Sequence, residues 1–399
     1  MYLPDKRILQ NYAKVLVDFA LNSGAGIKKG EVVSLQFDTV ALPLAHAVYL
    51  QILASGGFPI VRMSDDIFSK EMYTHGSNEQ LLFFPKKYIR SFIDTVDHRI
   101  ALLAERDPLY LKDVDPKKIM LSNKSTSLVR KWLFEKEDRG RMTWTLALFG
   151  TPGMAEQAGI SLEEYWEQII SACFLDAKDP LAQWRAVFKG LEKIRTTLST
   201  MRIQKLHVVA QDTDLWITVG ENRKWLGGGG RNIPSFEVFT SPDWRGTTGH
   251  IYFDYPLYRY GNIIKDVHLT FEKGKVIKAR ASKNESLLKA LIAQKNADKI
   301  GEYSLTDTRF SRINHFMANT LYDENFGGKW GNTHLAVGTS YHDTYTKDPK
   351  TLTAKKLKEL GYNESPEHCD IMATHNREVT ATLESGATKV IYKDGKFTV

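Results

Sequence analysis

The stretch Glu31-Val32-Val33-Ser34-Leu35-Gln36-Phe37 decides the fold class of the first part of the chain. Every second side chain in it is a large apolar one, which indicates a β-strand. A helical pattern over 42–54 follows, and 58–63 is predicted as the next strand. A further helical pattern over 78–94 leads to the strongly apolar strand 100–104. Alternating strands and helices with apolar strands predict a mainly parallel sheet covered by helices.

The pattern changes after Asp107-Pro108, and from Gln204 onward short strands and hairpins dominate. A chain of 399 residues is too long for one ordinary core, so we expect two domains. The prediction is an α/β chain with two parts. An N-terminal α/β domain spans 1–107, and a β-rich α+β domain that carries the catalytic site spans 108–399.

Composition argues against several classes of partner. The 54 Lys and Arg residues are interspersed with 47 Asp and Glu residues, and the densest basic run, Lys355-Lys356-Leu357-Lys358, is typical of a solvated helix face. We therefore expect no nucleic-acid partner. No apolar run reaches 18 residues, and only Cys173 and Cys369 are present, too few for a disulfide framework. These features predict a soluble, cytoplasmic protein without a membrane partner.

Glycine-rich sequences give no support for nucleotide binding. Neither phosphate-loop pattern follows a strand in residues 1–107. The run Gly227–Gly230 is not followed by a helical pattern, which favours a flexible loop or a close backbone approach over an anion cradle.

The strongest chemical signal is Glu367-His368-Cys369-Asp370-Ile371-Met372. In a strand, residues i and i+2 project from the same face, so His368 and Asp370 would point together while Cys369 points away. One imidazole and one carboxylate suit Zn²⁺, Co²⁺ or Mn²⁺. An isolated pair of this kind also fits a surface ion pair or a satisfied core histidine.

Other polar residues lie in apolar surroundings. His334 precedes the run Leu335-Ala336-Val337, which also fits a buried, hydrogen-bonded histidine. Glu237 and Glu302 each lie in an apolar, strand-forming run, where an ionised carboxylate is costly without a partner. Taken singly, each glutamate also fits an exposed strand position. The accumulation of carboxylates and histidines favours a metal site.

Five motifs occur in an order that closely resembles the thermophilic aminopeptidase family of metallopeptidases, of the aminopeptidase T and aminopeptidase S type. They are Asn232-Ile233-Pro234 through Glu237-Val238-Phe239-Thr240-Ser241-Pro242, Gly301-Glu302, Asp323-Glu324-Asn325, His334-Leu335-Ala336 with Gly338 and Tyr341, and His368 with Asp370 and Met372. The resemblance covers nearly the whole chain.

The resemblance implies a metalloaminopeptidase that acts on peptides with a free N-terminus and forms homodimers. It also implies two divalent ions (Zn, Co or Mn), with Tyr341 and Glu302 as catalytic side chains. The implied metal ligands are Glu237, Glu302, Glu324, His334, His368 and Asp370. Four carboxylates carry roughly −4, which two divalent ions would balance. Another dinuclear hydrolase, such as an amidase or carboxypeptidase, and an inactive binding homologue are the alternatives.

The chain departs from the family pattern in three places. Residues 326–333 make a longer link between Glu324 and His334, and Trp330 in this link is a candidate pocket-lining residue. Ser235-Phe236 and Ala373-Thr374 replace the residues usual beside two of the motifs. These departures concern substrate specificity more than the chemistry.

Overall fold

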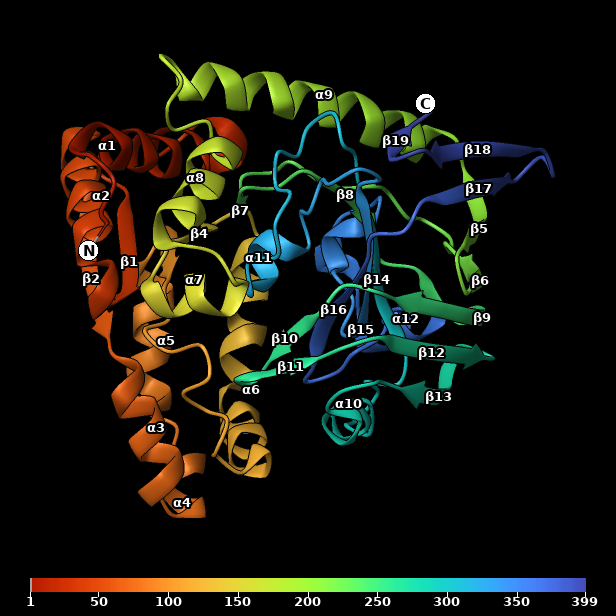
Figure 1. Cartoon of the computed structure of the whole chain (residues 1–399), viewed down its shortest axis with the longest axis horizontal. Helices are drawn as coiled ribbons and strands as arrows, with labels where there is room; N and C mark the ends of the chain where they lie inside the picture. Colours follow the sequence, from red (N-terminus) through yellow and green to blue (C-terminus); the bar gives the residue numbers. More distant parts are fainter. Residues whose placement is uncertain (1) are drawn as a thin grey trace. The chain divides into compact units, whose positions relative to one another are not determined.

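The computed structural model describes residues 2–399, apart from the side chains of 124–127, and these residues form two compact units. The first contains the chain up to Ala186 together with Gly229–Ser235, and the second contains Val187–Gly228 and Phe236–Val399. A parallel sheet with helices forms the first unit, and antiparallel sheets dominate the second (Figure 1). The predicted fold class is confirmed.

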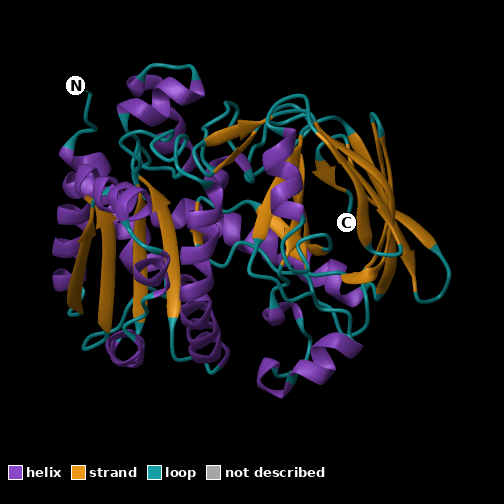
Figure 2. Cartoon of the chain, turned by 90° about the horizontal axis from the view of Figure 1, so that it is seen from below, coloured by secondary structure: helices purple, strands orange, loops and turns teal. Residues whose placement is uncertain are grey.

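The first unit is built on a five-stranded parallel sheet in the order β2-β1-β3-β4-β7, with helices on both faces (Figure 2). Its strands are β1 (Val32–Asp38), β2 (Phe58–Ser64), β3 (His98–Leu103), β4 (Thr143–Leu148) and β7 (Asn232–Ile233). Its helices are α1 (Lys6–Lys14), α2 (Leu42–Ala54), α3 (Asp66–His75), α4 (Asn78–Leu82), α5 (Lys86–Thr95), α6 (Pro116–Asp138), α7 (Pro152–Ala158) and α8 (Leu162–Ala172), and α9 (Pro180–Thr200) begins in this unit.

The boundary expected near Asp107 falls inside this first unit. After Asp107 the chain returns to the N-terminal sheet, because β4 pairs in parallel with β3. The single helix expected over 78–94 is in fact two helices, α4 and α5. Pro85 separates them, since proline lacks the backbone N–H and restricts the preceding residue.

The second unit contains an eight-stranded and a four-stranded antiparallel sheet. The larger sheet has the order β13-β12-β9-β6-β5-β17-β18-β19. Its strands are β5 (Ile203–Ala210), β6 (Thr213–Thr218), β9 (Asp243–Phe253), β12 (Val267–Glu272), β13 (Lys275–Arg280), β17 (Arg377–Leu383), β18 (Thr388–Lys393) and β19 (Lys396–Phe397). The remaining elements are the hairpin β10 (Leu257–Arg259) and β11 (Asn262–Ile264) with helices α10 (Glu285–Ile292), α11 (Thr320–Asp323) and α12 (Ala354–Glu359).

The smaller sheet has the order β16-β15-β14-β8 and two chemically different faces. Its strands are β8 (Glu237–Thr240), β14 (Ile300–Thr306), β15 (Asn332–Gly338) and β16 (His368–Ala373). One face buries apolar side chains in a core shared with the larger sheet, among them Val238, Tyr303, Leu305, Leu335, Val337, Cys369 and Ile371. Burying a large apolar side chain stabilises by roughly 1.5–3 kcal/mol, so this face fixes the register of the sheet.

No helix among the described residues combines the length and the apolar character that crossing a membrane requires.

Candidate metal centre

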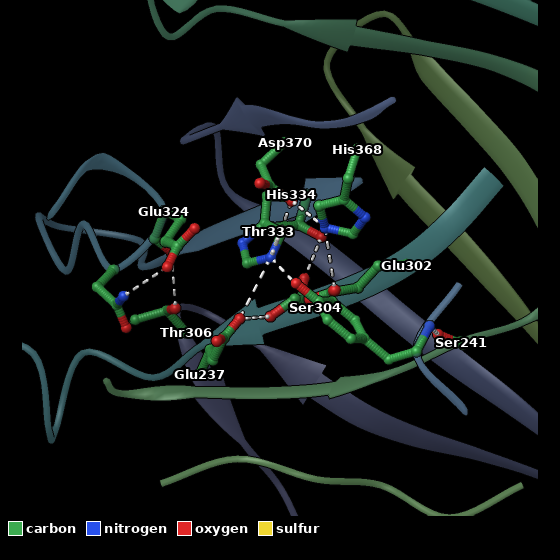
Figure 3. Close-up of polar contacts among 12 residues, drawn as sticks. Glu237, Ser241, Glu302, Ser304, Thr306, Glu324, Thr333, His334, His368 and Asp370 are labelled. Carbon is green, nitrogen blue, oxygen red and sulfur yellow. Dashed lines mark hydrogen bonds and ion pairs between the residues drawn. The ribbon is translucent and has the colours of Figure 1, made fainter. Parts of the chain in front are cut away.

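Five of the six side chains expected as metal ligands project from the second face of the four-stranded sheet (Figure 3). Glu302 on β14 lies opposite Ala336 on β15, which lies opposite Asp370 on β16. Antiparallel partners share a face, and so do residues two apart on one strand. His334 and His368 therefore join the same face, and Glu237 joins it through its partner Thr306.

Glu302 lies between the two histidines. Its Oε1 is 3.1 Å from His334 Nε2, and its Oε2 is 3.6 Å from His368 Nε2. Two groups of side chains offer ligand atoms that lie within 4.8 Å of one another. One group is Glu237, Glu302 and His334, and the other is Glu302, His368 and Asp370. Glu302 belongs to both groups, and its two oxygens face different histidines.

A main-chain hydrogen bond to Nδ1 fixes the orientation of the His368 ring. Its Nδ1 donates to the main-chain carbonyl of Thr339 at 2.9 Å, since a carbonyl oxygen only accepts. Its Nε2 therefore faces Asp370 Oδ1 at 3.3 Å. Burial disfavours the imidazolium, but the Asp370 carboxylate outweighs this effect and raises the pKa of His368 to about 9. A proton on Nε2 thus supplies the positive charge that a metal ion would supply in its place.

His334 lies deeper in the same cluster. Its Nε2 is 3.2 Å from Glu237 Oε2 and 4.0 Å from Asp370 Oδ1. Burial opposes a charge on the ring, yet the hydrogen bonds to Glu237 and Glu302 hold the pKa of His334 well above its usual value. Its Nδ1 is buried and has no hydrogen-bond partner within the described part of the chain.

The buried carboxylates do not all remain ionised without a cation. Burial raises the pKa of Glu302 to about 7 and, together with repulsion from Glu237, holds the pKa of Glu324 well above its usual range. Asp370 behaves differently. Burial favours its protonated form, but the neighbouring His368 holds its pKa below the ordinary value. This donor set of carboxylates and imidazoles, short of positive charge, fits divalent cations.

Glu324 lies at the edge of the cluster. It directly follows α11 and is buried, but it belongs to neither group of three. Its neighbours hold the turn in place. The Asp323 carboxylate accepts from the main-chain N–H groups of Met317 and Asn319 at 2.8 and 2.9 Å. Asn325 Oδ1 accepts from Phe236 N at 2.6 Å, which ties this turn to the start of β8.

Sequence reasoning assigned no role to Ser304, whereas the close backbone approach expected within Gly227–Gly230 is present at Gly227. Ser304 donates its Oγ hydrogen bond to Glu237 Oε2 at 3.0 Å. The available signal was its position two residues after Glu302, on the same strand face. Gly227 allows a close backbone approach, because a Cβ there would lie 2.0 Å from the carbonyl oxygen of Glu237.

Tyr341 follows β15, and its ring packs against two residues of the site. The centroid of the Tyr341 ring lies 4.9 Å from that of the His368 ring, in an edge-on arrangement, and 5.8 Å from that of the Phe239 ring. Burial, and then the negative charge of Glu302 and its neighbours, holds the pKa of Tyr341 well above its usual value. The phenol therefore stays protonated. A protonated phenol can donate a hydrogen bond.

The longer link before His334 is held against the β-rich core. Tyr392 donates its hydroxyl to the carbonyl of Thr306 at 2.7 Å and also lies 3.2 Å from the carbonyl of Trp330. Asn332 Nδ2 donates to the carbonyl of Glu324 at 2.9 Å. These contacts return the chain to β15 in register. The Trp330 side chain is half-buried, and its role as a pocket-lining residue stays a prediction.

The buried carboxylate–histidine cluster on one sheet face of the β-rich unit fits the metal centre of a metal-dependent hydrolase. Comparison with known proteins makes the assignment specific. The chain belongs to the thermophilic metalloprotease (M29) family, whose model matches residues 5–397. The resemblance inferred from the motifs is confirmed.

The relatives found by sequence and by structure agree with this assignment. Aminopeptidase PepS of Streptococcus thermophilus is 27% identical over 427 residues, covering 100% of both chains. Aminopeptidase T of Thermus thermophilus is 28% identical over 312 residues, covering 73% of this chain and 74% of that protein. The solved structure of wild-type AmpT from Thermus thermophilus matches with a TM-score of 0.83 and 24% identity, covering 99% of this chain and 100% of that one. This structural match supports the fold.

Proposed function

We propose that the chain is an aminopeptidase that removes N-terminal residues from peptides at a dinuclear metal centre. The observation that carries the proposal is Glu302, whose carboxylate is shared by two groups of three possible ligands. The proposed ligands are Glu237, Glu302, Glu324, His334, His368 and Asp370. The relatives named above as aminopeptidases support the choice of substrate.

Two divalent ions would supply Lewis-acid polarisation of the scissile carbonyl, an acidified water and a binding point for the substrate amine. The side chains of this protein do the rest. Ser304 holds the Glu237 carboxylate, and Thr339 holds the His368 ring. Glu302 orients both halves of the site. The Tyr341 phenol would donate a hydrogen bond to the oxyanion that develops as the carbonyl is attacked.

The test compares amino-acid p-nitroanilides with their N-acetylated forms. An aminopeptidase requires the free amine, so we expect turnover of the free substrates only. Equal turnover of the N-acetylated substrates would favour an amidase. Release of C-terminal residues from a peptide blocked at its N-terminus would favour a carboxypeptidase. Metal bound in stoichiometric amount, without turnover of any of these substrates, would indicate an inactive binding homologue.

The identity of the metal is a separate question. Imidazole and carboxylate ligands accept Zn²⁺, Co²⁺ and Mn²⁺ alike. We propose two of these ions per chain. Reconstitution of the chelated protein with each metal, followed by mass spectrometry of the bound metal and an activity assay, tests both the number and the preference.

We also propose a homodimer, and the first unit offers a surface for it. Of the 16 large apolar side chains that are exposed in the part of the chain that the structure describes, 12 lie between Leu42 and Tyr88. Phe58 and Met63 on the edge strand β2 are 61% and 62% exposed, and Phe68 on α3 is 76% exposed. Unprotected edge strands with apolar side chains pair with other strands. By contrast, the edge strand β13 carries lysine and arginine.

For location, we propose the cytoplasm. Cys173 and Cys369 are both free and buried, as is common in a reducing compartment.

A further inference from the structure

Arg223 is a buried cation that forms no ion pair with a carboxylate among the described residues. It is only 7% exposed. Its guanidinium instead donates to three main-chain carbonyls, those of Ser241 at 2.6 Å, Glu221 at 2.9 Å and Leu360 at 2.8 Å. Burial lowers its pKa. Burying a guanidinium without a carboxylate is costly, and the three hydrogen bonds to carbonyls offset part of that cost while holding those carbonyls in place.

Ser241 connects Arg223 to the candidate metal centre. Its carbonyl accepts from Arg223, and its Oγ accepts from the main-chain N–H of Tyr341 at 2.8 Å. Ser241 is completely buried and directly follows β8, the strand that begins with Glu237. The same residue therefore contacts the buried cation on one side and the backbone of Tyr341 on the other.

A second route reaches Tyr341 from Arg223 through side chains. The guanidinium lies over the ring of Tyr362, 3.5 Å from its centroid. The Tyr362 hydroxyl lies 3.3 Å from Thr344 Oγ1, which in turn donates to the carbonyl of Tyr341 at 2.7 Å. The N–H of Tyr341 is thus held by Ser241, which Arg223 contacts directly. The carbonyl of Tyr341 is held by Thr344, which Arg223 reaches through Tyr362.

This support matters because Tyr341 lies outside the sheet. It comes three residues after the end of β15, so no strand pairing fixes the direction of its side chain. Its ring nevertheless lies against His368. A displacement of about 1 Å at a catalytic group is enough to lower a rate by ~10²-fold. The residues that hold the Tyr341 backbone therefore control where its phenol points.

We propose that Arg223 and Ser241 are positioning residues that hold the Tyr341 phenol toward the carboxylate–histidine cluster. The inference rests on the proposed function, in which that phenol stabilises the developing oxyanion. Ser241 acts through its hydroxyl on Tyr341 N, and Arg223 acts by fixing the carbonyl of Ser241 and the ring of Tyr362. Neither residue touches the substrate.

The decisive test is Ser241→Ala in the wild-type chain and in the Tyr341→Phe variant, both metal-replete. In the wild-type chain we expect kcat to fall ~10-fold with unchanged KM and metal content, because only the direction of the phenol is disturbed. In Tyr341→Phe, which has no hydroxyl to misplace, we expect no further fall. Thr247→Ser is the matched control, since it also alters a fully buried side chain of the second unit and should keep full kcat.

The outcomes separate this inference from the proposed function. An equal fall of kcat in both backgrounds, or full kcat in Ser241→Ala, overturns the positioning role while leaving the aminopeptidase assignment intact. Full kcat in Tyr341→Phe overturns the role of the phenol and the positioning role together. If the metal-replete wild-type chain shows no peptidase activity, that result would instead contradict the proposed function.

Arg223→Lys provides the second measurement. Lysine keeps the charge but cannot reach three separate carbonyls with a planar fork. We expect the same ~10-fold fall of kcat as for Ser241→Ala, again absent from the Tyr341→Phe background. Circular dichroism and metal content, measured on the same samples, identify a folded variant. A folded, metal-replete Arg223→Lys with full kcat would overturn the role of Arg223.

Discussion

Among the single residues of the candidate metal centre, Glu302 has the largest expected effect on metal binding. Its two oxygens face different histidines, and it alone is common to both groups of possible ligands. We predict that Glu302→Gln loses both ions, whereas Asp370→Asn weakens mainly one. Mass spectrometry after dialysis against metal near the protein concentration measures this. Retention of both ions by Glu302→Gln would contradict a shared ligand.

The Tyr341 phenol defines a second prediction for a single residue. Tyr341→Phe keeps the ring that packs against His368 and Phe239, so fold and metal content should not change. We expect kcat to fall by ~10²-fold, the size of the effect when one oxyanion donor is lost. KM should change little, because the ground-state carbonyl gains less from this donor. Steady-state kinetics of the metal-replete variant checks the prediction, and unchanged kcat would return Tyr341 to a packing role.

Individual residues differ in how far their structural role can be predicted from the sequence. The shared direction of His368 and Asp370, with Cys369 turned into the core, followed from the period of a strand and is confirmed. Arg223 could not have been found in this way. Its partners are carbonyls of Glu221, Ser241 and Leu360, and any residue type supplies a carbonyl.

At the scale of elements, the turn around Glu324 depends on its asparagine. Asn325 is fully buried, accepts from Phe236 N and donates to Leu321 O at 3.0 Å. Asn325→Ala leaves both partners unsatisfied, which we predict costs about 2–4 kcal/mol of unfolding free energy. Metal affinity should also fall, because Glu324 loses its support.

Urea denaturation in the presence of chelator measures the stability term of Asn325→Ala without the metal. The matched control is Asn376→Ala, which removes an exposed hydrogen bond to Asp394 and should change stability by less than about 0.5 kcal/mol. Equal stability of the two variants would show that the Asn325 bridge contributes little.

Elements with local signals were predictable. The helical pattern over 42–54 is an example, since the helix spans Leu42–Ala54 in the structure. Sheet membership was not visible. Whether β4 joins the first sheet depends on pairing with β3, a contact between residues about 45 positions apart that leaves no local pattern.

At the scale of the whole molecule, the buried charges of the site link metal binding to stability. Without metal, the cluster relies on protons to limit repulsion between its carboxylates. We predict that chelation lowers the unfolding temperature and that Zn²⁺, Co²⁺ or Mn²⁺ restores it, since a ligand that binds only the folded state stabilises it. Differential scanning calorimetry tests this. Glu302→Gln should respond much less to chelator, and an unchanged wild-type unfolding temperature would argue against bound metal.

The apolar surface of the first unit leads to a prediction about assembly. Phe68→Asp places a charge on the most exposed of these side chains and should shift the protein from dimer to monomer, as measured by light scattering during size exclusion. Ile277→Asp is the matched control, because Ile277 is 60% exposed but lies on β13 in the second unit. A dimer that persists in Phe68→Asp, or a monomeric wild-type chain, would contradict this surface.

The two faces of the four-stranded sheet also determine which genetic changes the second unit tolerates. Side chains facing the carboxylate–histidine cluster and side chains facing the core alternate along β15 and β16, and along β14 from Glu302 onward. A point substitution therefore removes one ligand or one core contact. Deletion of a single codon within β14 would exchange the two sets beyond the deletion, sending Leu305 toward the carboxylate–histidine cluster and Thr306 toward the core. Deletion of two adjacent codons would shorten the strand but keep each remaining side chain on its own face, so libraries of deletions should show an odd–even pattern of survival.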